Sequence, residues 1–221
     1  VVSEDNEHFF RQENINVVLP RKQETEMSPK TSFSRWLSYS LKQFEEAFIN
    51  HDQPLDRKHH ILIDVANGHM PSVLQAAING KEKYGDSLVL MVGNIANPET
   101  YRILSEAGAD YIRIGIGNGG GCLTTQQTGI GYPMASLIEE TYEVSMHLDK
   151  PAKIVADGGF KKYADVIKAL AIGADYVMLG SILNKALESA GETVDEDGET
   201  IDQYNQSAES YLKAGGKLSK K

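Results

Sequence analysis

The sequence has few of the features that would assign a protein to a familiar class at once. Its 221 residues include one cysteine, Cys122, so no internal disulfide can form, which favours a reducing cytoplasm. No apolar run approaches the roughly 18 residues of a membrane span, and no signal-peptide pattern opens the chain. Basic residues are scarce: 22 Lys and Arg stand against 31 Asp and Glu, for a net charge of −9. This balance argues against a nucleic-acid partner. We expect a cytoplasmic protein that binds neither nucleic acid nor membrane.

Short apolar runs alternate with amphipathic segments along most of the chain. Strands are predicted at 15–19, 36–40, 60–64, 88–92, 111–115, 152–156 and 176–180. Helices are predicted at 41–49, 71–85, 97–109, 134–148 and 161–174. Pro71 and Pro98 stand where a first-turn proline is tolerated, Asn97 is a plausible N-cap, and Gly108 and Gly173 are suited to the helix C-termini. Continuous apolar strands that alternate with helices are typical of a parallel α/β fold.

The end of this pattern favours a closed barrel over an open sheet. Glycines follow two consecutive strands, in "VADGG" (155–159) and "MLGS" (178–181). In a TIM barrel, the loops after strands seven and eight bind phosphate at this place. Counting back leaves seven strands, and residues 3–12 are predicted as the helix that follows the absent first one. We therefore predict a TIM (β/α)8 barrel lacking its first strand, and expect the chain to be a fragment of a longer protein.

The barrel pattern stops at Glu192. We assign residues 1–192 to a catalytic barrel domain and residues 193–221 to a polar segment of the same domain. That segment is acidic and then basic, with no core-forming period. It is interpreted either as a solvated hairpin and tail or as a flap that closes over an active site.

The single cysteine follows a predicted strand, within "RIGIGNGGGCLTTQQTGIGYP" (113–133). The glycines before Cys122 allow backbone amides to stabilise a thiolate, which favours a catalytic thiol over an inert buried one. Thr124 and Thr125 follow within hydrogen-bonding range. The segment also matches GxGxxG, but we expect a loop after it instead of the helix of a dinucleotide-binding fold, so we reject a Rossmann interpretation.

The quoted cysteine segment, together with "ADGG" and "MLGS", resembles the inosine monophosphate (IMP) dehydrogenase and guanosine monophosphate (GMP) reductase family. The stretches "LIDVANGH" (62–69) and "VGNIANPET" (92–100) resemble strand ends of the same family. The resemblance covers residues 14–192 and implies a TIM barrel, a homotetramer, and redox chemistry at C2 of a purine nucleotide, GMP or IMP. The implied cofactor is NADP or NAD.

The resemblance also implies a role for each candidate residue. Cys122 would attack purine C2, and Thr124 and Glu188 would handle the leaving amine. Asp157 would accept hydrogen bonds from the ribose hydroxyls. The 5′-phosphate would be held by Gly120, Gly158, Gly159, Gly180 and Ser181. The nicotinamide cofactor would face Asp64, Asn67 and Gly68. Potassium would be bound by the backbone carbonyls of Gly117, Gly119 and Cys122.

Simpler interpretations stay open for several of these residues. Asp64 and Asp157 could cap strand ends, Gly180 and Ser181 could form a tight turn, and Glu188 could be a surface residue. Three histidines, His59, His60 and His69, suggest a metal site, but no acidic ligand stands at a zinc-type spacing.

The family contains two reactions, and the sequence favours one. "TGIGYP" (128–133), "DVANG" (64–68) and the absence of an inserted regulatory domain resemble the reductases, which convert GMP to IMP with NADPH. "CLTTQQ" departs from the usual threonine directly after the cysteine, which bears on substrate preference. IMP dehydrogenase, which converts IMP to xanthosine monophosphate (XMP) with NAD, stays open. So do an FMN-binding barrel and a non-catalytic nucleotide-binding relative.

Overall fold

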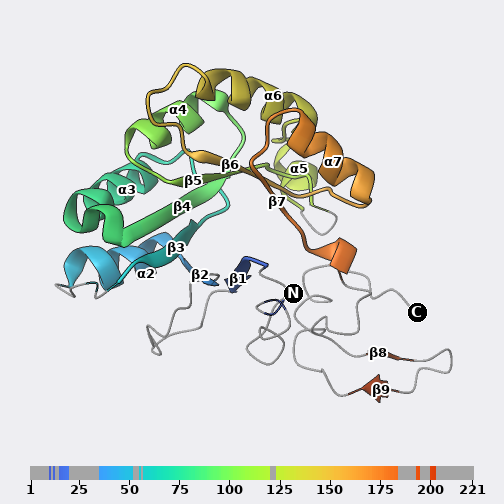
Figure 1. The fold of residues 1–221 in the computed structure, drawn as a ribbon, viewed down its shortest axis with the longest axis horizontal. Helices are drawn as coiled ribbons and strands as arrows, with labels where there is room; N and C mark the ends of the chain where they lie inside the picture. Colours follow the sequence, from blue (N-terminus) through green and yellow to red (C-terminus); the bar gives the residue numbers. More distant parts are fainter. Residues whose placement is uncertain are drawn as a thin grey trace.

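The computed structural model describes residues 15–19, 35–51, 57–119, 123–183, 193–194 and 200–202, with residues 10, 12 and 55. Seven parallel strands form one sheet in chain order. They are β1 (Val17–Leu19), β2 (Arg35–Tyr39), β3 (His59–Asp64), β4 (Leu88–Ile95), β5 (Tyr111–Ile114), β6 (Lys153–Asp157) and β7 (Tyr176–Met178). The sheet curls into a half-barrel with helices along its outer side (Figure 1). This fits a partial TIM barrel, as predicted, and every predicted strand is present with ends shifted by a few residues.

The longer helices lie where the amphipathic segments predicted them, and one short helix and two 3-10 turns are additions. They are α2 (Leu41–Phe44), continued by the π-helical η1 (Glu45–Asn50), α3 (Pro71–Tyr84), the 3-10 turn η2 (Gly85–Ser87), α4 (Pro98–Glu106), α5 (Thr124–Thr128), α6 (Met134–Ser145), α7 (Tyr163–Ala171) and the 3-10 turn η3 (Ser181–Leu183). Pro71 and Pro98 occupy first-turn positions, and Asn97 Oδ1 accepts from Glu99 N at 2.7 Å. Gly108 and Gly173 follow their helices with φ of 89° and 117°, as helix-ending glycines do.

The expectation of a loop at residues 124–128 was wrong, because α5 is a helix of five residues. Its sequence has no apolar period, so the pattern gave no helical signal. The turn is held locally: Thr128 Oγ1 donates to Thr124 O at 2.6 Å, and left-handed Gly129 closes it by donating to Thr125 O at 2.9 Å. The rejection of a Rossmann interpretation now rests on the fold, since the glycine segment follows the fifth strand of a curled half-barrel.

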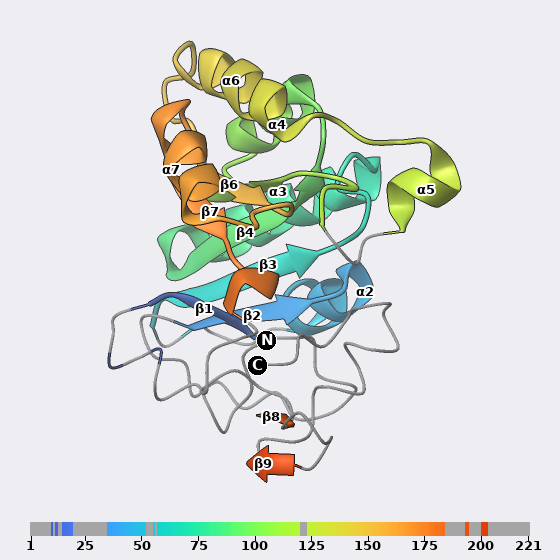
Figure 2. The same cartoon turned by 90° about the vertical axis from the view of Figure 1, so that its right-hand side faces the viewer.

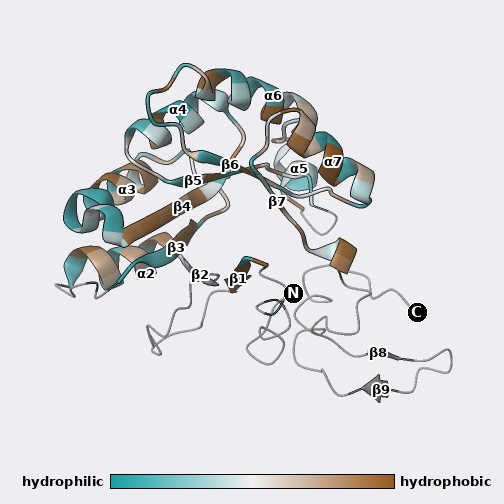
Figure 3. Cartoon of the chain, viewed as in Figure 1, coloured by the Kyte–Doolittle hydropathy of each residue, from teal (hydrophilic) through white to brown (hydrophobic). Residues whose placement is uncertain are grey.

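The two faces of the strands explain their continuous apolar runs. One face packs beneath the helices in the main core, and the other forms a smaller cluster inside the curl. Figure 3 shows β4 coloured as hydrophobic along most of its length. The inner cluster consists of Trp36, Leu62, Met91 and Val155, all 4% exposed or less. Because strand side chains alternate between faces, Asp64 and Asp157 share the inner face with Leu62 and Val155. On the inner face, the polar residues at the strand ends therefore come directly after the apolar residues of this cluster.

Within the segment interpreted as a flap, β8 (Thr193–Val194) and β9 (Thr200–Asp202) pair as an antiparallel hairpin. The division between residues 1–192 and 193–221 stays a prediction. The helix predicted at residues 3–12 lies almost wholly outside the described residues. None of the helices described is long and apolar enough to cross a membrane.

Candidate active site

A buried arginine joins two of the predicted site residues. Asp64 ends β3, Asp157 ends β6, and Arg113 lies on β5 between them in the sheet order. Arg113 Nη2 donates to Asp64 Oδ1, and Arg113 Nε lies 3.7 Å from Asp157 Oδ2. The Arg113 side chain is 12% exposed and each carboxylate side chain 27% exposed. The two aspartates therefore surround one partly desolvated cation, which no sequence pattern had indicated.

Gly93 on β4 makes this contact possible. In the sheet, Gly93 stands opposite both Asp64 on β3 and Arg113 on β5. A Cβ atom added at Gly93 would lie 2.5 Å from both the Cβ and the backbone oxygen of Arg113. Because the glycine has no side chain, the arginine can reach across β4 to Asp64.

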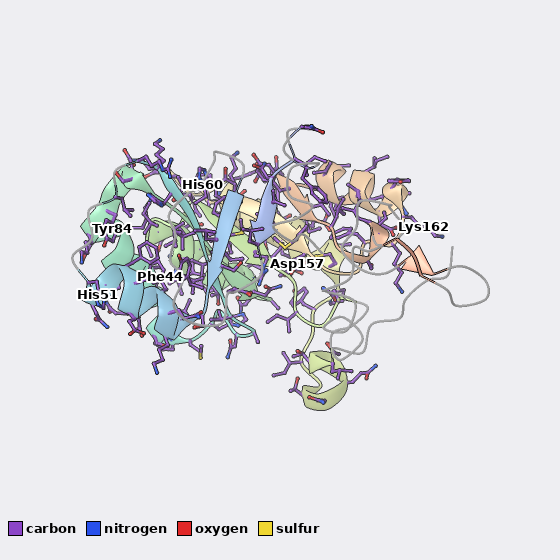
Figure 4. All side chains as sticks on the ribbon, turned by 90° about the horizontal axis from the view of Figure 1, so that it is seen from below. Phe44, His51, His60, Tyr84, Asp157 and Lys162 are labelled. Carbon is purple, nitrogen blue, oxygen red and sulfur yellow. The ribbon has the colours of Figure 1, made fainter. Side chains whose placement is uncertain are left out.

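Asn94 holds Asp157 from a second direction. The register of β4 shifts between Gly93 and Ile95, and Asn94 lies at this irregularity. Asn94 Nδ2 donates to Asp157 Oδ2 at 2.9 Å and to Gly115 O at 2.7 Å. Asp157 thus contacts side chains from two other strands, which a simple strand-end cap does not require. Figure 4 shows Asp157 near the middle of the molecule, well away from Phe44 and Tyr84 in the outer layer.

The predicted phosphate loop packs on the glycine segment that precedes the cysteine. Gly158 and Gly159 have φ of 100° and 87°. A Cβ at Gly158 would lie 2.9 Å from Gly119 N, and one at Gly159 would lie 2.9 Å from Asn118 O. Only glycine fits such a close approach between two backbones. The β5 and β6 loops therefore meet at the carboxyl end of the sheet.

Gly180 and Ser181 follow β7 at the same end. Asp157 pairs with Met178 in the β6–β7 register, so the turns after β6 and β7 are neighbours. Among the residues that the structure describes, a Cβ at Gly180 would meet no atom within 4 Å, and Ser181 opens η3. Packing against these residues does not require a glycine at position 180, whereas a ligand that approaches the backbone would.

The residues predicted to act in catalysis are Cys122, Thr124 and Glu188. Cys122, Gly120 and Glu188 lie outside the described residues. Thr124 begins α5, which stands away from the half-barrel on the side toward which β2 and β3 point (Figure 2). Three backbone carbonyls were predicted to bind potassium. Those of Gly117 and Gly119 belong to described residues, and that of Cys122 does not.

The predicted cofactor residues lie at the end of β3, where Asp64 stands, and in the loop between β3 and α3, which holds Asn67 and Gly68. Gly68 N donates to Asn94 O at 2.8 Å, and a Cβ at Gly68 would lie 2.7 Å from Ile95 Cγ2. The loop is therefore fixed against the end of β4. Asn67 is exposed beside it, and its Oδ1 atom accepts a hydrogen bond from His69 N at 3.1 Å. An exposed amide next to a fixed backbone suits the polar carboxamide and ribose of a nicotinamide cofactor.

The three histidines do not form one site. His59 and His60 begin β3, at the end opposite to His69 in the β3–α3 loop. His60 packs edge-on against Trp36 with ring centroids 5.0 Å apart, and its burial lowers the pKa of its imidazole. Among the residues that the structure describes, no group of three or more His, Cys, Asp or Glu could hold a metal ion.

Comparisons with known proteins agree on one family. The family model described as "IMP dehydrogenase / GMP reductase domain" matches residues 52–217. A GMP reductase of Streptococcus pneumoniae (strain G54) is 35% identical over 181 residues, covering 82% of this chain and 54% of the relative. An inosine-5'-monophosphate dehydrogenase of Chlorobaculum parvum is 43% identical over 134 residues, covering 61% of this chain and 26% of the relative. An inosine-5'-monophosphate dehydrogenase of Bacillus subtilis is 43% identical over 134 residues, covering 60% of this chain and 27% of the relative.

The chain spans about half the length of these reductases and about a quarter of the length of these dehydrogenases. Because the family model covers most of the chain, and the sheet and its strand-end loops agree with the resemblance seen in the sequence, the protein belongs to the IMP dehydrogenase / GMP reductase family.

Proposed function

We propose that this chain is a purine nucleotide oxidoreductase that acts at C2 and converts GMP to IMP with NADPH. The observation that carries the proposal is the Asp64–Arg113–Asp157 cluster, which lies between the loop expected to face the cofactor and the loop expected to bind the nucleotide. Among the relatives above, the GMP reductase matches the larger share of the chain, 82%. This supports the reductase.

The nucleotide is held by residues at the carboxyl end of the sheet. Asp157 accepts hydrogen bonds from the ribose hydroxyls, and the backbone amides of Gly158, Gly159, Gly180 and Ser181 bind the 5′-phosphate, with Gly120. Asn94 and Arg113 orient the Asp157 carboxylate before the nucleotide arrives. Such preorganisation lowers the entropic cost of placing C2 for reaction.

The reaction proceeds through a covalent bond to the nucleotide. The Cys122 thiolate adds to C2 of GMP, and the 2-amino group leaves as ammonia with a proton supplied through Thr124 and Glu188, giving a thioimidate. Asp64, Asn67 and Gly68 would hold NADPH, which would supply the hydride for C2. The C–S bond then breaks, which returns the thiolate and releases IMP. Two easier steps replace one difficult step.

The resemblance supports three further parts of the proposal. We infer a homotetramer, a cytoplasmic location, and a potassium ion bound by the carbonyls of Gly117, Gly119 and Cys122. Potassium dependence is checked by replacing it with lithium in the assay below.

IMP dehydrogenase is the second candidate, because the Chlorobaculum parvum dehydrogenase is 43% identical over 134 residues. In that reaction, Cys122 adds to C2 of IMP, the hydride leaves to NAD, and water hydrolyses the thioimidate to XMP. The two candidates share the nucleotide site and differ in whether ammonia or water takes part.

Paired assays test the proposal. The full chain is mixed with GMP and NADPH, and separately with IMP and NAD, and nicotinamide absorbance is followed. Oxidation of NADPH that depends on GMP and releases ammonia is the expected result. Reduction of NAD with IMP would assign the dehydrogenase instead. Turnover in neither mixture, with a folded protein, would contradict the proposed function.

A further inference from the structure

His69 connects three polar groups in the loop between β3 and α3. Its Nδ1 atom lies 2.9 Å from Asn67 Oδ1, and its backbone N–H donates to the same oxygen at 3.1 Å. On the other side of the ring, Ala96 N donates to His69 Nε2 at 3.1 Å. One imidazole thus joins the β3–α3 loop to the residues that precede α4.

These partners fix the protonation state of the ring. A backbone N–H can only donate, so Nε2 must be the unprotonated acceptor, and the proton lies on Nδ1. Nδ1–H and the His69 backbone N–H therefore both donate to Asn67. The atom of the Asn67 amide that faces them must be its oxygen, and the Nδ2 amine faces away from His69.

The histidine completes a set of contacts between the two loops. Val65 N donates to Gly93 O at 2.8 Å, Asn94 N donates to Val65 O at 2.7 Å, and Gly68 N donates to Asn94 O at 2.8 Å. These bonds fix the backbone near the strand ends. His69 adds a contact with Ala96 to these bonds. Unlike the backbone bonds, the contacts of His69 orient a side chain, that of the exposed Asn67.

We propose that neutral His69 is a positioning residue for the nicotinamide cofactor, holding Asn67 so that its Nδ2 amine donates to the bound cofactor. This inference rests on the proposed function. When His69 is protonated, both ring nitrogens carry hydrogen, so Nε2–H meets Ala96 N–H and that contact is lost. The ring is then no longer held by Ala96, so the Nδ1–H group that bonds to Asn67 loses its fixed position, and the cofactor binds more weakly.

The electrostatic surroundings agree with a neutral ring. Burial lowers the pKa of His69 below its usual value of 6.5. The charged residues of the two segments are engaged elsewhere: Asp64 pairs with Arg113, and Glu99 pairs with Arg102. The loss of cofactor affinity is therefore expected below pH 6.5, in mildly acidic solution.

Three variants of the full chain separate the two ring contacts. His69→Asn keeps a donor near the position of Nδ1, His69→Gln places an acceptor near the position of Nε2, and His69→Ala removes both. His147→Ala is the matched control, because His147 is an exposed histidine on a different segment, after α6. NADPH binding is measured by its fluorescence between pH 5.5 and 8.5, and kcat and both KM values are measured at pH 7.5.

We expect His69→Ala to weaken NADPH binding about tenfold, with kcat and the KM for GMP changed less than about twofold. His69→Asn and His69→Gln should recover part of the affinity and lose the acid inflection that the wild type shows. His147→Ala should behave like the wild type.

Two results would overturn the inference alone: wild-type NADPH affinity in His69→Ala, or an unchanged acid inflection in His69→Asn. An imidazole ¹⁵N spectrum that places the proton on Nε2 at pH 7.5 would overturn it without reference to the cofactor. A wild-type chain that binds neither NADPH nor NADH would contradict the proposed function itself, and the cofactor role of His69 with it.

Discussion

Two carboxylates share one guanidinium inside the half-barrel, so the charge balance of this region depends on Arg113. Its side chain is 12% exposed, and it contacts Asp64 directly and Asp157 at 3.7 Å. Without it, each of the two partly buried carboxylates would lose its contact with a cation, although Asp157 would keep its hydrogen bond from Asn94. Removing one partner from a buried ion pair is strongly destabilising because the other charge is left uncompensated.

Arg113→Met is therefore expected to lower the free energy of unfolding by about 3 kcal/mol and to abolish nucleotide turnover. Arg113→Lys should lose less stability, since it keeps the charge without the planar fork of donors. Urea denaturation measures the change. Arg102→Met is the control: Arg102 pairs with Glu99 and Glu106 on the exposed face of α4, where little change is expected. Equal losses in the two methionine variants would contradict the role of Arg113.

A buried tyrosine gives a second prediction, independent of the site. Tyr101 on α4 is fully buried, and its hydroxyl donates to Ala152 O just before β6. Tyr101→Phe should lower the free energy of unfolding by about 1–2 kcal/mol, because it leaves a buried carbonyl without this donor. Tyr163→Phe is the control, since Tyr163 is 79% exposed.

The same tyrosine should contribute to alkaline unfolding. Burial raises the pKa of Tyr101 from 10.0 to about 12. A raised pKa means that the folded state favours the neutral phenol, so this contribution to stability is present below pH 10 and is lost as the pH rises toward 12. In Tyr101→Phe, the decrease in stability between pH 10 and pH 12 should be smaller than in the wild type. An identical pH dependence would contradict this assignment.

Part of the site could be predicted from single residues, and part could not. Asp64 and Asp157 follow apolar strands and precede loops, so their place at the strand ends was visible in the sequence. The role of Arg113 could not be predicted, because its segment "YIRIG" has the pattern of an ordinary strand. Its role depends on the register of β3, β4 and β5 and on the missing side chain of Gly93. Pairing between strands far apart in the chain is not encoded in any local pattern.

At the scale of elements, the contact between the loops that follow β5 and β6 can be tested for its role in binding the nucleotide. Gly159→Ala would place a Cβ 2.9 Å from Asn118 O at a φ of 87°. We expect weaker GMP binding, by about tenfold or more, because the turn must move away from its neighbour. Gly129→Ala is the matched control: its φ of 69° is also strained, but its added Cβ meets no atom of the described residues within 4 Å. Calorimetric titration with GMP measures both.

If Gly129→Ala weakens GMP binding as much as Gly159→Ala does, backbone strain alone accounts for the effect. The β5–β6 loop contact would then have no specific role in binding the nucleotide.

The helix ends were predictable, and their further contacts were not. "EAGAD" (106–110) and "AIGAD" (171–175) predicted helix-ending glycines. In the structure, the aspartate that follows each glycine also caps a neighbouring strand: Asp110 Oδ2 accepts from Leu90 N at 2.7 Å, and Asp175 Oδ2 accepts from Ile154 N at 2.8 Å. The Gly-Ala-Asp pattern, which occurs in both segments, was the feature of the sequence that could have indicated these caps. α5 gave no such indication, since its five residues are polar throughout.

At the scale of the whole molecule, the alternation of strands and helices was enough to predict the architecture. Parallel strands buried on both faces appear as continuous apolar runs, and the order β1 to β7 follows directly from repeated strand–helix units. The sequence could not show which side chains meet inside the curl. The inner cluster of Trp36, Leu62, Met91 and Val155 comes from four strands, and its side chains meet because the sheet is curved.

We propose that this fold delivers a purine nucleotide to Cys122 for covalent reaction at C2. The most direct test compares wild-type chain and Cys122→Ser in GMP-dependent oxidation of NADPH, with intact-mass measurement after mixing with GMP. The wild type should turn over and show a mass increase that matches a covalent purine nucleotide. Cys122→Ser should still bind GMP, show no added mass, and lose turnover by several orders of magnitude. Wild-type turnover in Cys122→Ser would contradict the mechanism.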